Sequence, residues 1–512
     1  MVQTKENKKP IILIYPKTGY EFFSTQAPPH GLLAIAAHLK KEGFNPIILD
    51  QRIDEKFNQK LDEIISNALF VGISSMTGMQ LKYALEITER IKEKRKNLKV
   101  IWGGIHPTIR PKEVLENKSI DLVVVGEGEK RFVEIANILS KSKDSKKSRD
   151  KQVEKELKKK LKNIKSIGYR EKNKIIINPK DKLLLPKEFL RTPWELIDLE
   201  KYINKYKKDK KFVRELDIGM TSKGCPGNCY FCYNLAVNKA QWRGISANEV
   251  VERISEVVKN YSINFIILRD DDFFADINRV RDICQGIIKH KLNIEWYSAG
   301  IRIKQFKEMP DELLVLIKKS GCTSFRFGAE SGSAKILKEI NKEIIPQDII
   351  NSNIRCKKFG IIPNYSFMMG FPKESLNDIM KTVDMLDRLK EDNPKTVIHG
   401  INILTPYPGT AVYSIMKHEG MIEPQKTTDW LKFHHMTLVT PHFTEKEKKE
   451  IRNINELSYM TSEIAYKSLK SGIKPLAWLL VKWAQFRWKR RMFSFAPELT
   501  VIKFLRKITL NI

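Results

Sequence analysis

Three cysteines occupy one short stretch, Cys225-Pro-Gly-Asn-Cys229-Tyr-Phe-Cys232, and they are the residues of this chain best suited to chemistry. Thiolates at the unequal spacing CxxxCxxC can wrap one iron–sulfur cube and bind three of its four irons. The last iron then stays open to a small-molecule ligand, which indicates a cluster that does chemistry. A zinc knuckle is the alternative, but it needs a fourth Cys or His. The nearest downstream candidates, Cys284 and His290, lie more than fifty residues away.

The cysteine stretch follows the first of six strand-like segments, which alternate with segments of helix length. These segments are Val213–Met220, Phe265–Arg269, Ile294–Ala299, Ser324–Gly328, Asn364–Met369 and Val397–Leu404. Such alternation is typical of a (β/α) barrel, whose catalytic groups gather at the carboxyl ends of the strands. The three cysteines lie at such an end.

Further polar residues follow the other predicted strands. Asp271 and Asp272, in the run Arg269-Asp-Asp-Asp272, suit hydrogen bonds to a ribose or to a substrate, and they are equally well explained as capping or solvated loop acids. Arg302 suits a carboxylate partner. Tyr407 follows the sixth strand near the expected mouth of the barrel. Asp271, Asp272, Arg302 and Tyr407 are therefore the substrate-binding candidates, and no catalytic residue is assigned.

Residues 8–139 alternate short apolar strands with helical segments, which predicts an α/β fold with a doubly wound parallel sheet. The expected strands are Ile11–Tyr15, Pro46–Leu49, Leu69–Ser74, Lys99–Trp102 and Asp121–Val125. Ligands of such sheets bind at the carboxyl ends of the strands. The small residues found at those ends are Ser74, Ser75, Thr77, Gly103, Gly104 and Gly126.

The cysteine loop, with the aromatic Phe231 before its last cysteine, resembles the signature of the radical SAM superfamily. The resemblance implies a [4Fe-4S] cluster on Cys225, Cys229 and Cys232 whose open iron chelates S-adenosylmethionine, and a partial barrel of six units. Two later elements, Gly328-Ala-Glu330-Ser331-Gly332 and Gly370-Phe-Pro372-Lys-Glu374, are similar to motifs of the same superfamily. The residues that this likeness assigns to S-adenosylmethionine are Phe231, Glu330, Ser331, Gly370 and Pro372.

The first domain looks like the cobalamin-binding domain of one branch of that superfamily. The matching pieces are Pro28-Pro-His-Gly-Leu-Leu33, Gly72-Ile-Ser-Ser-Met-Thr77, Gly103-Gly104-Ile-His106-Pro107 and Val125-Gly126-Glu-Gly-Glu129. The likeness assigns cobalamin to the six small residues at the strand ends. The chain has no Asp-x-His-x-x-Gly triplet, so a bound cobalt would lack a lower histidine ligand. The alternative is a domain of the same fold that binds no corrin.

With both cofactors, the reaction expected from the resemblance is methylation of an unactivated carbon. The alternative is radical oxidation or ring formation, as in the anaerobic porphyrin-ester cyclases, and a third class is a non-catalytic corrin or redox sensor. A transfer-RNA methylthiotransferase is disfavoured because no cysteine precedes Cys225. The expected partners are a small-molecule substrate and an electron donor such as a flavodoxin or ferredoxin.

The expected organisation has four parts: a cobalamin-binding domain (8–139), a Lys-rich insertion and connector (140–211), a radical SAM barrel (212–430) and a helical C-terminal region (431–512). No signal peptide is visible, and six cysteines in 512 residues form no disulfide framework, which favours a reducing cytoplasm. Cys284, Cys322 and Cys356 are predicted to be core residues.

The formal net charge of +31 indicates an acidic partner, either nucleic acid or an anionic membrane. Residues 141–165 hold twelve Lys/Arg and four Asp/Glu without an aromatic residue, so they predict a solvated insertion and disfavour nucleic acid. The tail 474–507 combines Trp478, Trp483 and Trp488 with basic residues. It predicts either a helix packed on the barrel or a peripheral contact with the inner face of the membrane, and then a lipid-like substrate.

Overall fold

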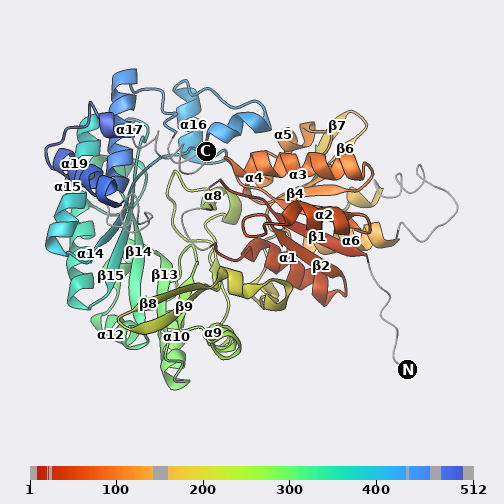
Figure 1. Cartoon of the computed structure of the whole chain (residues 1–512), viewed down its shortest axis with the longest axis horizontal. Helices are drawn as coiled ribbons and strands as arrows, with labels where there is room; N and C mark the ends of the chain where they lie inside the picture. Colours follow the sequence, from red (N-terminus) through yellow and green to blue (C-terminus); the bar gives the residue numbers. More distant parts are fainter. Residues whose placement is uncertain are drawn as a thin grey trace. The chain divides into compact units, whose positions relative to one another are not determined.

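The computed structural model describes residues 9–19, 21, 26–141, 159–433, 437–461 and 474–499. Two compact units are present: Met1–Gly219 with Pro424–His434, and Met220–Glu423 with His435–Ile512. Most of the Lys-rich insertion, residues 142–158, lies outside the described residues, as do Lys503, Arg506 and Lys507 of the tail. Each unit is built around its own large sheet (Figure 1).

The first sheet has seven strands in the order β2-β1-β3-β4-β5-β6-β7. Its five parallel strands are β1 (Pro10–Tyr15), β2 (Asn45–Asp50), β3 (Phe70–Ser74), β4 (Val100–Gly103) and β5 (Leu122–Val124). These strands read as continuous runs of Val, Ile and Leu because both faces of a parallel sheet are covered by helices. The doubly wound parallel sheet predicted from the sequence is confirmed.

Helices connect the parallel strands and cover the sheet (Figure 1). They are α1 (His30–Lys41), α2 (Phe57–Ile65), α3 (Gln80–Lys94), α4 (Ile105–Ile109), α5 (Pro111–Glu116) and α6 (Glu129–Lys141). The apolar sides of α1 and α6 meet over β1 in a core that includes Leu13, Leu32 and Phe132. This packing fixes the strand ends, where the loops can vary without loss of the core.

The region predicted as a connector contains strands that extend both sheets. A hairpin of β6 (Ile167–Glu171) and β7 (Lys174–Ile177) adds two antiparallel strands to the first sheet. A second hairpin pairs β8 (Asn204–Lys208) with β9 (Lys211–Asp217). The sequence NKYKK of β8 gave no strand signal because an exposed edge strand needs few apolar residues and is protected by lysines.

The second sheet has the order β16-β15-β14-β13-β12-β9-β8 and forms the predicted half-barrel. Its parallel strands are β12 (Phe265–Leu268), β13 (Glu295–Ile301), β14 (Cys322–Glu330), β15 (Ile362–Met369) and β16 (Val397–Ile403). A short ladder of β10 (Ser222–Lys223) and β11 (Arg243–Gly244) flanks the cysteine loop. All six predicted strands are present.

Helices cover one side of the half-barrel. They are α9 (Ala247–Tyr261), α10 (Ile277–Lys289), α11 (Ile303–Glu308), α12 (Asp311–Lys319), α13 (Ala334–Glu339), α14 (Pro346–Lys358) and α15 (Leu376–Asp392), whereas α8 (Asn234–Asn238) directly follows the cysteine loop. An aromatic core with Phe306, Phe325, Phe327 and Tyr365 lies beneath them. Residues on alternate strand positions therefore face the opposite, concave side.

Helix α16 (Ala411–His418) follows the last strand of the half-barrel, and the described part of the C-terminal region is helical, as predicted, with α17 (Glu445–Met460) and α19 (Lys474–Lys489). Helix α17 binds the edge strand β16, where Asn455 Nδ2 donates to the Ile401 carbonyl at 2.6 Å. Within the described residues, no helix has the length and apolar character needed to cross a bilayer.

Candidate functional site

The cysteine loop is held in place by three consecutive carboxylates at the end of β12. Asp270 accepts hydrogen bonds from the backbone and hydroxyl of Thr221 at 3.0 and 2.9 Å. Asp271 accepts from the Gly224 N–H at 3.0 Å, and Asp272 Oδ2 lies 3.6 Å from the sulfur of Cys225. The acids proposed as substrate ligands thus contact the segment that leads into the first cysteine.

The three thiols are partly buried and form no disulfide. Burial raises the pKa of Cys225 to about 12 and that of Cys232 to about 11, and it also raises the pKa of Cys229. Such thiols stay protonated at neutral pH unless a cation binds their thiolate form. Iron supplies that charge, so the loop suits a cluster better than it suits reactive free thiols.

The described residues contain no group of three or more His, Cys, Asp or Glu side chains arranged to hold a single metal ion. A cube does not require such a group, because each of its thiolate ligands binds a different iron. The donor set of three thiolates fits a cluster with one open iron.

Lys342 is a site residue that the sequence did not reveal. Its Nζ lies 2.8 Å from Glu330 Oε1 and 5.9 Å from the centre of the Phe231 ring. Burial alone would lower the pKa of Lys342, but the charges of Glu330 and of Cys229 outweigh burial and raise it. A cation and an anion therefore lie together beside the cysteines, and they suit the carboxylate and ammonium groups of an amino acid.

Arg302 is the second cation near the cysteines. Its guanidinium pairs with Glu343, and its charge lowers the pKa of the Cys225 and Cys229 thiols against the effect of burial. Arg302 is thus already paired within the protein, whereas Asp272 accepts from Gln305 Nε2 at 2.8 Å through Oδ2 and keeps Oδ1 buried with no hydrogen-bond partner among the described residues. The position of Arg302 favours a role beside the cluster loop.

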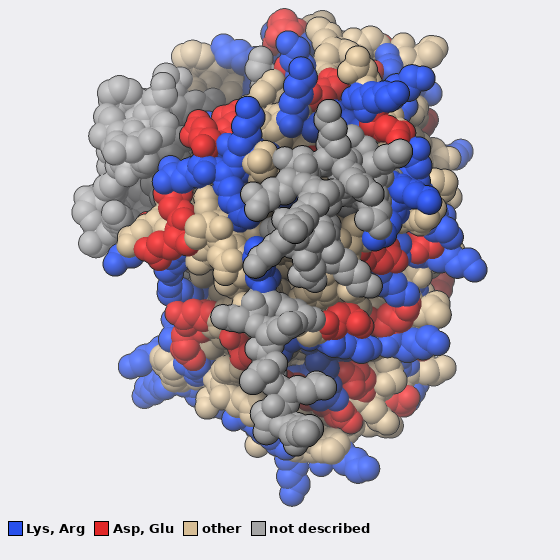
Figure 2. Space-filling model, turned by 90° about the vertical axis from the view of Figure 1, so that its right-hand side faces the viewer, with Lys and Arg blue, Asp and Glu red and all other residues tan. Residues whose placement is uncertain are grey.

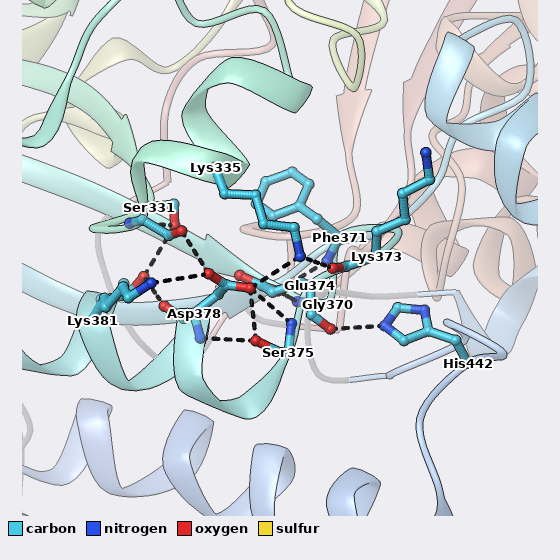
Figure 3. A network of polar contacts seen from close by, with 12 residues as sticks. Ser331, Lys335, Gly370, Phe371, Lys373, Glu374, Ser375, Asp378, Lys381 and His442 are labelled. Carbon is cyan, nitrogen blue, oxygen red and sulfur yellow. Dashed lines mark hydrogen bonds and ion pairs between the residues drawn. The ribbon is translucent and has the colours of Figure 1, made fainter.

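Ser331 and Gly370 belong to a polar network that shapes two strand ends (Figure 3). The Ser331 hydroxyl is buried and lies 3.2 Å from Thr382 Oγ1. Gly370, with φ of +90°, donates its N–H to Glu374, which also accepts from the Phe371 N–H at 3.1 Å. Burial raises the pKa of Glu374 to about 8, so its carboxyl group closes this turn largely without a charge.

The aromatic candidates lie near these elements. Phe231 packs edge-on against Phe371 with ring centres 5.8 Å apart, so the cysteine loop and the Gly370 turn contact each other. Pro372 is half-buried in that turn. The carbonyl of Tyr407 accepts from the hydroxyl of Thr410 at 2.7 Å, which closes the turn after β16.

The small residues of the first unit lie together at the carboxyl edge of its parallel sheet. Ser74 is the register partner of Gly103 on the neighbouring strand, and Gly104 follows directly. The hydroxyl of Ser75 is buried without a hydrogen-bond partner. Gly126 has φ of +86°, and no atom lies within 4 Å of the position that a Cβ would take. This cradle of small side chains, with an unsatisfied hydroxyl, fits a large polar ligand.

Thr77 at the same edge is held by a buried histidine. Its hydroxyl lies 3.0 Å from Nδ1 of His106, which is fully buried and whose pKa is lowered by that burial. Nε2 of His106 lies 3.5 Å from Glu113, and the Trp430 Nε1 donates to Glu113 at 3.0 Å. The sequence shows His106 only as part of the motif Gly103–Pro107. Its contact with Thr77 is supported through Glu113 by Trp430, which lies more than 300 positions away in the chain.

Charges are mixed on the face of the molecule shown in Figure 2. Lys and Arg are numerous there, but Asp and Glu lie between them, and the described residues show no continuous basic surface on that face. On this face, the basic side chains are therefore interspersed with acidic ones rather than gathered into one stripe.

Two family models match the chain: the B12 binding domain over residues 23–136 and the Radical SAM superfamily over residues 220–386. The resemblance inferred from the motifs is thereby confirmed. The chain carries a B12-binding domain followed by a radical SAM domain, and it is an enzyme of the cobalamin-dependent radical SAM class.

Known proteins with this arrangement differ in their reactions. An uncharacterized methyltransferase of Pyrococcus horikoshii is 29% identical, over 90% of this chain and 94% of its own length. The anaerobic magnesium-protoporphyrin IX monomethyl ester cyclase of Synechocystis is 22% identical, over 84% and 80%. The structure of the cobalamin-dependent S-adenosylmethionine radical enzyme OxsB with aqua-cobalamin has a TM-score of 0.72 at 16% identity, covering 98% of this chain and 76% of OxsB. That likeness supports the fold.

Proposed function

We propose that the protein is a cobalamin-dependent radical SAM methyltransferase that methylates an unactivated carbon of a small molecule. The observation that carries the proposal is that one chain holds both sites. The three-thiolate loop lies beside Lys342 and Glu330 in the second unit, and the cradle of small residues lies at the edge of the sheet in the first unit. A relative of nearly the same length, the Pyrococcus protein, is described as a methyltransferase. Bound together, the cofactors would supply reductive cleavage of a sulfonium and transfer of a methyl group.

The protein's own residues would bind and orient these groups. Cys225, Cys229 and Cys232 would hold three irons, and the acids of the Asp270–Asp272 run would fix the loop that carries them. Lys342 and Glu330 would hold the carboxylate and ammonium of S-adenosylmethionine, with Phe231, Ser331, Gly370 and Pro372 shaping the surrounding turns. Ser74, Ser75, Thr77, Gly103, Gly104 and Gly126 would contact cobalamin.

The products of the reaction test this proposal. Methylation uses one S-adenosylmethionine as methyl donor, which leaves S-adenosylhomocysteine, and a second as the source of the hydrogen-abstracting radical, which leaves methionine and 5′-deoxyadenosine. Anaerobic protein with cobalamin, reduced flavodoxin or ferredoxin and a small-molecule extract of the source cells, which supplies the methyl acceptor, should form both S-adenosylhomocysteine and 5′-deoxyadenosine. Formation of 5′-deoxyadenosine alone, with cobalamin bound, would favour oxidation or cyclisation. This second candidate function is supported by the similarity to the ester cyclase.

We also propose that the tail, residues 474–507, makes a peripheral contact with an anionic membrane. Such a contact would suit a lipid-like substrate. Helix α19 is anchored by Arg487, paired with Glu498 at 2.9 Å, and by the indole of Trp488, which donates to Asp387 at 2.8 Å. The opposite side of α19 leaves Trp478, Leu479, Trp483 and Phe486 exposed, and Met492 and Phe495 are exposed beyond the end of the helix. Exposed Lys482, Lys489 and Arg490 lie among them. An aromatic and basic helix face of this kind suits a membrane interface.

Liposome sedimentation tests the tail. The variant with Trp483→Ser and Phe486→Ser removes exposed rings that are 48% and 44% accessible, so it should fold normally and lose most binding to anionic vesicles. Ile422→Ser, at an apolar side chain that is 90% exposed elsewhere, is the matched control and should bind as the wild type does. Equal sedimentation of all three proteins at low salt would remove the membrane contact from the proposal.

A further inference from the structure

Three neighbouring strands of the half-barrel present polar side chains on one face. Arg326 of β14 is the register partner of Asn364 of β15, and Asn364 is the partner of Val397 of β16. His399 lies two positions after Val397 and therefore faces the same side as Val397. Paired residues of adjacent parallel strands point to the same side. Phe325 and Phe327, on either side of Arg326, are fully buried in the aromatic core under the helices. Arg326, Asn364 and His399 therefore share the concave face.

Two groups of this set are unpaired within the described part of the fold, the half-buried guanidinium of Arg326 and the buried Oδ1 of Asn364, whereas the ring of His399 is exposed to solvent. Among the residues that the structure describes, neither the guanidinium of Arg326 nor the ring of His399 has a hydrogen bond or ion pair, and Oδ1 of Asn364 is buried without a partner. Polar groups are seldom left unpaired inside a fold, because each loses its bonds to water without replacement. A half-buried arginine without a carboxylate partner calls for an anion.

The cluster lies close to the Glu330–Lys342 pair. A Cβ at Gly328 would lie 2.2 Å from Glu330 Oε1 and 2.9 Å from Lys342 Nζ, so this pair covers Gly328. Gly328 is two positions after Arg326 on the same face, which corresponds to about 7 Å along the strand. The hydroxyl of Tyr459 donates to Asn402 at 2.5 Å and extends the polar surface on the edge strand.

We propose that Arg326, Asn364 and His399 bind a substrate that carries a carboxylate or phosphate group. The guanidinium would give paired donors and the imidazole a further donor to the anion, and Oδ1 of Asn364 would accept from a hydroxyl or N–H of the same substrate. The assignment of this ligand as substrate rests on the proposed function. The site would favour substrates that carry an anionic group, because a purely hydrophobic substrate would leave the guanidinium of Arg326 unpaired.

Anion binding by the full-length protein tests the inference without any turnover. Inorganic phosphate and citrate are titrated by calorimetry into wild type, Arg326→Gln and Asn364→Ala, with Arg388→Gln on the outer surface of α15 as the control. Wild type and the control should bind at least one anion saturably, and Arg326→Gln should bind it at least about 10-fold more weakly, because hydrogen bonds to charged groups are the stronger ones. Ligand-free Arg326→Gln should melt at the wild-type temperature or above, since no partner is lost.

Three results would overturn the inference: no saturable binding by wild type, equal binding by Arg326→Gln, or a lowered melting temperature of the ligand-free variant. Titration with S-adenosylhomocysteine separates the two sites. If Arg326→Gln weakens S-adenosylhomocysteine and leaves phosphate and citrate unchanged, the arginine belongs to the cofactor site instead. Formation of 5′-deoxyadenosine is assayed separately, so a failed anion site and a failed enzyme assignment give different results.

Discussion

Replacement of Cys229 by alanine is expected to abolish formation of 5′-deoxyadenosine and the visible absorption of the reconstituted cluster. Cys229 contributes one of three thiolates, and no other cysteine precedes Cys225 or lies in the loop to replace it. Loss of an outer partner of a metal ligand already costs about 10- to 100-fold in affinity or activity, and loss of a direct ligand should cost more. Iron content and nucleoside products of the anaerobic protein, with a strong reductant, measure the effect.

The matched control is Cys284→Ala, at a cysteine that is fully buried on α10. This variant removes a sulfur from the core and should keep both the cluster and the products. If Cys229→Ala keeps wild-type iron content and activity, the cluster assignment is wrong. If both variants lose iron, instability of the fold is the cause, and the melting temperatures of the two proteins will show it.

The sheets could be predicted because their strands are buried on both faces. A run such as Ile11–Tyr15 is apolar throughout, and its length and flanking turn residues identify a parallel strand without any knowledge of its neighbours. The edge strand β8 escaped prediction for the opposite reason. β8 is mostly exposed, so burial places almost no constraint on its sequence, and its position follows from pairing with β9.

The residues of the candidate site also differ in how well the sequence alone reveals them. The cysteines are close in sequence, so their spacing alone indicates a shared ligand. Lys342 is one of 92 basic residues, and nothing local distinguishes it. Lys342 becomes a candidate only through its contact with Glu330, which depends on the fold of the backbone. Arg326 likewise needs the order of β14, β15 and β16 before its neighbours Asn364 and His399 are known.

Replacement of Gly126 by leucine is expected to remove most of the cobalamin binding. Gly126 follows β5 at the carboxyl edge of the first sheet, with φ of +86°, and a Cβ there meets no atom within 4 Å. A leucine would extend into the space that the proposed corrin occupies. The predicted loss in affinity is at least 10-fold, which corresponds to about 1.4 kcal/mol. Cobalt retained after gel filtration with hydroxocobalamin is the measurement.

Gly420→Leu separates this steric effect from backbone strain. Gly420 has φ of +100°, its Cβ would also meet no atom within 4 Å, and it lies in the turn after α16. Both variants pay the same penalty of about 1–2 kcal/mol for a side chain in the left-handed region. Only Gly126→Leu should lose cobalt, whereas both should keep the cluster on Cys225, Cys229 and Cys232. Equal retention of cobalt by the two variants would mean that the edge of the first sheet is not the corrin site, because a ligand that contacts Gly126 cannot share its space with a leucine.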